Sequence, residues 1–96
     1  MYYDKDGSPL ELMEWAKKFE APDYKRIAKT TLPDGKWVST VWLGLNHSWG
    51  IDPPLIFETM VFSSEENLRD LATLRYATLK EAEDGHNEVV ARFSNV

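Results

Sequence analysis

The chain has 96 residues, a formal net charge of −5 and no cysteine. This length supports one hydrophobic core, so we expect a single domain spanning residues 1–96. The missing cysteines exclude disulfides, thiolate zinc sites and thiol catalysis. The excess of acidic side chains disfavours direct binding of nucleic acid and favours basic partners. No apolar run approaches the ~20 residues of a membrane span, so we expect no membrane contact and a cytoplasmic location.

Residues 9–20 form the first predicted helix, after a short strand at residues 2–3. Ser8 is the expected N-cap, Pro9 takes the first helical position, and Glu11 completes a capping box. Apolar residues spaced i, i+3, i+4 and i+7 predict the buried side of this helix: Leu12, Trp15, Ala16 and Phe19.

Residues 26–32 and 37–45 are predicted to form a β-hairpin. The connection Pro33-Asp34-Gly35-Lys36 is typical of a tight turn, because Pro presets φ and Gly accepts a positive φ. Large apolar side chains alternate onto both faces of the second strand, with Trp37 and Val41 on one face and Trp42 on the other. We therefore expect this strand, and the hairpin with it, at the centre of a sheet.

The second half of the chain adds a strand at 55–62, a short helical turn at 63–70, a strand at 71–76 and a helix at 78–93. Thr78 and Glu81 are spaced as a capping box for that helix. Its expected buried stripe consists of Leu79, Ala82, His86, Val89, Val90 and Phe93. The predicted fold class is α+β: an antiparallel sheet of three to four strands, with an N-terminal and a C-terminal helix packed on it.

Two long motifs are LPDGKWVSTVWLGLNH at residues 32–47 and PPLIFETMVF at residues 53–62. With the C-terminal RYAT, EA and GH segments, they resemble a family of short uncharacterised proteins of bacteriophages, prophages and some bacteria. The resemblance implies a small accessory protein of mobile genetic elements, and it brings no catalytic residues. Such proteins often act on host machinery, including as inhibitors of CRISPR defence.

Acidic side chains form the main candidate binding surface. One group lies on the polar side of the last helix and a second group precedes it in sequence: Glu81, Asp84 and Glu88, then Glu65, Glu66 and Asp70. A solvated helix face is the plain interpretation. The functional hypothesis is that these carboxylates imitate a phosphate array and bind a basic groove of a host protein. Trp49 is a further candidate contact for a partner.

The loop at residues 46–54 has the most suggestive chemistry, because His47, Ser48 and Asp52 are the residue types of a catalytic triad. It has no nucleophile-elbow motif, and the His residues lack the spacing of metal ligands. We therefore expect neither an enzyme nor a metal or cofactor site. His86 is expected at the edge of the core, donating to a carbonyl. Trp37 and Trp42 are expected in the core, with a ligand groove or a partner-binding surface as the alternative.

The sequence thus favours an interaction protein: a phage- or prophage-type inhibitor that binds a basic host protein or nucleic-acid-handling complex, with anti-CRISPR activity as the leading case. One alternative is a structural or regulatory phage protein without a role in defence. Another is a small ligand-binding or enzymatic domain that uses the loop around His47.

Overall fold

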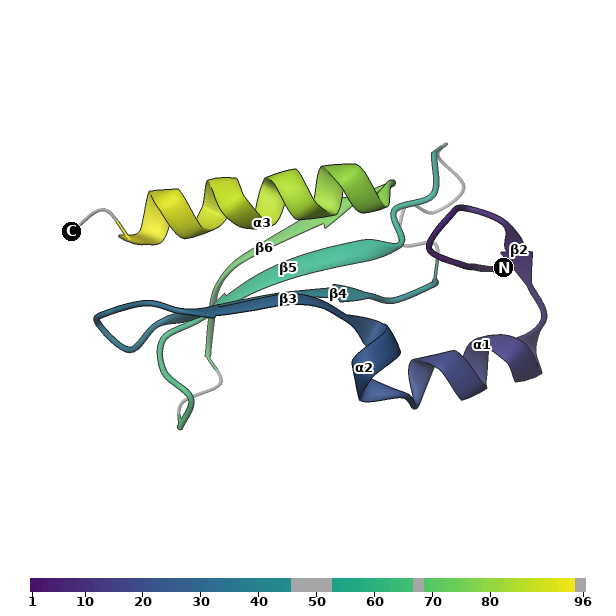
Figure 1. Cartoon of the computed structure of the whole chain (residues 1–96), viewed down its shortest axis with the longest axis horizontal. Coiled ribbons are helices and arrows are strands. Elements are labelled where there is room, and N and C mark those ends of the chain that lie inside the picture. The colour runs from purple at the N-terminus through teal and green to yellow at the C-terminus, as the bar shows by residue number, and fades with distance from the viewer. Residues whose placement is uncertain (46–52, 67–68, 95–96) are drawn as a thin grey trace.

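The computed structural model describes residues 1–45, 53–66 and 69–94. A four-stranded antiparallel sheet runs in the order β3 (Arg26–Thr31), β4 (Trp37–Trp42), β5 (Phe57–Phe62) and β6 (Asp70–Tyr76). Helix α3 (Leu79–Ser94) lies along one face of this sheet and contacts all four strands (Figure 1). The predicted α+β class and the C-terminal helix on the sheet are confirmed.

The N-terminal elements gather at one end of the sheet. Strand β1 (Tyr2–Tyr3) pairs with β2 (Pro9–Leu10), and helices α1 (Leu12–Phe19) and α2 (Pro22–Lys25) lead into β3 (Figure 1). Trp15 joins α1 to the end of the sheet, because its indole Nε1 donates a hydrogen bond to the Leu43 carbonyl at 2.8 Å. The N-terminal helix therefore packs at the end of the sheet rather than across a face.

Helix α1 starts later than the sequence indicated. The Ser8 hydroxyl and amide both donate to the Asp6 carboxylate, at 2.5 and 2.9 Å, so Ser8 closes a turn instead of capping a helix. Pro9 and Leu10 are then used by β2, and Glu11 becomes the N-cap without a side-chain bond. The predicted capping box at Ser8 is wrong, and Leu12, expected on the buried side, is exposed.

The hairpin of β3 and β4 is present, but it is not central. Strands β4 and β5 occupy the middle of the sheet, and β3 forms one edge. Positively charged side chains on β3, Arg26 and Lys29, are typical of an edge strand, where charge discourages pairing with other chains. The expected helical turn at 63–70 is also wrong within the described residues 63–66 and 69–70, which hold no helix, and β6 begins at Asp70.

The core consists of two apolar clusters on the α3 side of the sheet, and the second of them also packs against the N-terminal elements. One contains Val38, Val61 and Val89, and the other contains Trp42 and Phe57. A polar layer lies at the register position between them, where Thr40 and Thr59 face each other across β4 and β5. His86 of α3 completes that layer.

The start of α3 agrees with its sequence. The Glu81 amide donates to the Thr78 hydroxyl, and the Thr78 amide donates to the Glu81 carboxylate, each at 3.1 Å. This is the reciprocal pattern of a capping box, so that prediction is confirmed. One turn further on, Gly85 gives room to the ring of Tyr76, which any Cβ at position 85 would overlap.

Candidate functional site

The side of the sheet opposite α3 is the most distinctive surface of the molecule. We call it the open face, because Figure 1 shows no described helix lying along it as α3 lies along the other side. The strand register places twelve side chains on it: Arg26, Lys29 and Thr31 of β3, Trp37, Ser39 and Val41 of β4, Glu58, Met60 and Phe62 of β5, and Asp70, Thr73 and Arg75 of β6.

Four of the six open-face positions on the two central strands are apolar, with Ser39 opposite Met60 and Glu58 opposite Val41. Trp37 and Phe62 are cross-strand neighbours whose rings stack with centroids 4.4 Å apart, and Val41 and Met60 continue the apolar surface. All four side chains remain partly accessible to solvent. The Trp37 indole is held in place, since its Nε1 donates to the Ser64 carbonyl at 2.9 Å. An apolar centre with a charged border is the usual anatomy of a protein-binding surface.

The charged border is arranged along the diagonals of the open face. Arg26 is at the corner beside Val41, and Asp70 is at the opposite corner beside Phe62. At a third corner the Arg75 Nε donates to the Glu58 carboxylate at 3.0 Å, so the two charges balance each other. Thr31 takes the fourth corner. The face is thus positive at one corner and negative at the corner diagonal to it.

A shallow groove of about 260 Å³ indents the open face beside α2. Its lining holds three cations and no carboxylate: Pro22, Lys25, Arg26, Lys29, Trp37, Ser39 and Val41. Lys29 Nζ lies 4.7 Å from the centroid of the Trp37 ring and 3.1 Å from the Glu65 carboxylate. The groove was not predicted from the sequence, because α2, which contributes Pro22 and Lys25 to it, was not predicted either.

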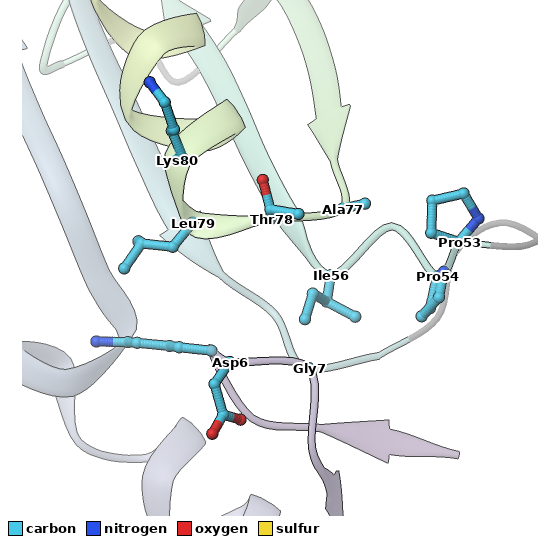
Figure 2. A pocket seen from close by; sticks show the side chains of 10 residues that line it. Asp6, Gly7, Pro53, Pro54, Ile56, Ala77, Thr78, Leu79 and Lys80 are labelled. Carbon is cyan, nitrogen blue, oxygen red and sulfur yellow. The ribbon is translucent and has the colours of Figure 1, made fainter.

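A second hollow, of about 460 Å³, lies between the turn at Asp6-Gly7 and the start of α3 (Figure 2). Ile56 lines it and is only 1% exposed. The ammonium groups of its two lysines are engaged elsewhere: Lys80 binds Asp84 at 2.8 Å, and Lys5 lies 3.9 Å from the centroid of the Tyr24 ring. The hollow therefore offers mainly apolar contacts.

The predicted acidic residues lie on opposite sides of the sheet. Glu81 is occupied in the capping box, Asp84 pairs with Lys80, and Glu88 is exposed on α3. In the second group, Asp70 lies on the open face and accepts from the Thr73 hydroxyl at 3.4 Å, and Glu65 pairs with Lys29 of that face, while Glu66 is exposed. The fold does not join the two groups into one surface. Trp49 lies outside the described residues.

Of the residues considered for catalysis or metal binding, His47, Ser48 and Asp52 lie outside the described residues. His86 is buried rather than at the core edge, and it contacts the hydroxyls of Thr30 through Nε2 at 2.9 Å and of Thr40 through Nδ1 at 2.7 Å. Burial lowers the pKa of His86 below its ordinary value of 6.5. Trp42 is in the core as expected, whereas Trp37 is on the open face.

Within residues 1–45, 53–66 and 69–94, no three His, Asp or Glu side chains are grouped closely enough to hold a metal ion. No helix in the same ranges is long and apolar enough to span a bilayer. Comparisons with protein families, with curated proteins and with solved structures found no match.

Proposed function

We propose that this protein acts by binding another protein chain, and that the open face is its docking surface. The observation that carries the proposal is the apolar centre formed by Trp37, Val41, Met60 and Phe62, which α3 leaves uncovered. Apolar surface on a sheet is normally covered by a second layer, because covering it removes it from water. In this fold α3 supplies that layer on one face only, so a partner would supply it on the other.

The charges at the border of the open face favour binding of one particular partner over binding of any apolar surface. Arg26 and Asp70 mark opposite corners, and the groove beside α2 carries three cations. Charges around an apolar centre orient a partner and reject those whose charges do not match. His86, the described residue best suited to acid–base chemistry, is buried among threonines and is out of reach of a substrate.

Capture from a cell lysate with matched variants tests this proposal. Met60→Asp places a charge at the apolar centre, and Met13→Asp places the same charge on α1, where Met13 is 72% exposed. We expect wild type and Met13→Asp to retain the same protein, and Met60→Asp to lose it while still unfolding in a single cooperative urea transition. Retention of that protein by a folded Met60→Asp variant would move the docking surface elsewhere.

A more specific hypothesis concerns the outer side of α3. Four carboxylates are exposed there, namely Glu81, Glu83, Asp84 and Glu88. Helix α3, which carries them, lies on the side of the sheet opposite the open face (Figure 1), so the two surfaces can be used at the same time. We propose that these carboxylates face a basic, nucleic-acid-handling host protein, as in a phage- or prophage-type inhibitor, with anti-CRISPR activity as the leading case.

A further inference from the structure

We propose that the occupant of the open face is a second copy of this chain, and that the two sheets pack face to face around a two-fold axis. This inference rests on the proposed function, because it names the partner of the same surface. It predicts a dimer with four layers, in which the two sheets are inside and the two α3 helices are outside. Closed two-fold pairs are the commonest protein oligomers.

The charges at the corners of the open face are self-complementary. The register sets Arg26 opposite Val41 at one end of β3, and Asp70 opposite Phe62 at the other end of β6. Rotation about the diagonal between Thr31 and Arg75 exchanges these two corners. Arg26 of each copy then lies over Asp70 of the other, so the pair forms twice.

The other in-plane axes give poorer matches, and the second diagonal would set Arg26 against Arg26 and Asp70 against Asp70. An axis parallel to the strands would set Arg26 of one copy over Arg75 of the other, because these residues lie at the same end of the two edge strands. An axis perpendicular to the strands would set the two Lys29 side chains against each other at the middle of β3. The diagonal axis avoids both repulsions, and Arg75, which lies on it, is already balanced by Glu58.

The same rotation also matches the apolar centre. A diagonal axis crosses the two sheets at nearly a right angle, which is one of the two standard arrangements for packed sheets. The strand spacing then brings Phe62 of one copy toward the groove beside Arg26 and Lys29 of the other. Cations over an aromatic ring are attracted to its face, so the ring and the groove are compatible.

Sedimentation equilibrium of the whole chain tests the dimer. We expect wild type to sediment at twice 11.1 kDa, and Met60→Asp to be a folded monomer. Arg26→Glu should raise the dimer dissociation constant at least tenfold, since it sets like charges together at two places, and Asp70→Arg should do the same. The double variant Arg26→Glu/Asp70→Arg should regain the dimer, and the two single variants should form a mixed dimer when combined.

A matched control and clear contrary results complete the test. Glu83→Arg makes the same kind of charge reversal on the outer side of α3, and it should leave the dimer unchanged. A wild-type monomer, a dimer that survives Met60→Asp, or a double variant no tighter than the single ones would overturn the two-fold model. If the monomer still captured a different protein in a way that depends on Met60, the proposed docking function would stand and only the second copy would be wrong.

Discussion

The two faces of the sheet are built from the same alternating strands, yet they differ in what covers them. On the α3 side, Val38, Trp42, Phe57 and Val61 are fully buried and belong to two core clusters. On the open face, their neighbours Trp37, Val41, Met60 and Phe62 are equally apolar but partly accessible. Apolar side chains on both faces of a central strand therefore indicate two surfaces that need covering. In this fold α3 covers one of them as the chain folds.

The largest expected effect is on the free energy of unfolding, and it differs between the tryptophans on the two faces of the sheet. Trp42→Ala removes a side chain that is 0% exposed and hydrogen-bonded through Nε1 to the Tyr3 carbonyl at 3.0 Å. We expect it to lower the free energy of unfolding by about 3–5 kcal/mol, as large core truncations do. Trp37→Ala, at a dilution where the chain is monomeric, should cost less than half as much, because its ring is partly exposed. Urea unfolding of both variants measures the difference, and equal losses would place Trp37 in the core.

The sequence predicted the centre of the fold better than its border. Strand β4 and the capping box of α3 were predictable because each depends on residues close together in the chain. The position of β3 at the edge was not predicted, although Arg26 and Lys29 on one side of it are the pattern of an edge strand.

The errors at the N-terminus have a physical cause in local competition. Ser8 can cap a helix or close a turn. Its amide and hydroxyl donate to the Asp6 carboxylate, two residues earlier, and these hydrogen bonds favour the turn. Trp37 was named as an alternative partner-surface residue, but its pairing with Phe62 at the candidate site was missed for another reason. Trp37 and Phe62 are 25 positions apart in the chain, so their stacking depends on the register of β4 and β5, which the sequence pattern did not specify.

A smaller effect concerns the polar layer beneath α3. Because burial lowers the pKa of His86 in the folded chain, the unfolded chain binds a proton at higher pH than the folded chain does. The contribution of neutral His86 to the free energy of unfolding should therefore be complete above pH 6.5. It should be lost progressively as the pH falls from 6.5 toward the lower pKa of the folded chain. Urea unfolding at several pH values between 7.5 and 5.5 should show this decrease.

Two variants assign that pH dependence to one side chain. His86→Gln should remove the decrease between pH 7.5 and 5.5, while His47→Gln should keep it, since no other histidines occur in the chain. An unchanged slope in His86→Gln would mean that other groups titrate in this range. Thr40→Val, which removes the hydroxyl in contact with Nδ1, is expected to lower stability at all pH values by about 1–3 kcal/mol, because it leaves a buried ring nitrogen unpaired.

The smallest expected effect is on the outer side of α3, and it bears on the inhibitor hypothesis. Glu88→Lys should change the free energy of unfolding by less than about 0.5 kcal/mol, because the side chain is exposed. Glu81→Lys should cost about 1 kcal/mol, because it breaks the capping box with Thr78. If the carboxylates of α3 face a basic partner, reversing Glu83 and Glu88 together should slow association with the protein that wild type captures. The slowing should shrink as salt rises from about 50 to about 500 mM, because the screening length of exposed charges falls from roughly 14 Å to roughly 4 Å. Association rates of wild type and this double variant at both salt concentrations provide the measurement. Equal rates at low salt would show that these carboxylates only keep the helix solvated, and would leave the open face as the binding surface to pursue.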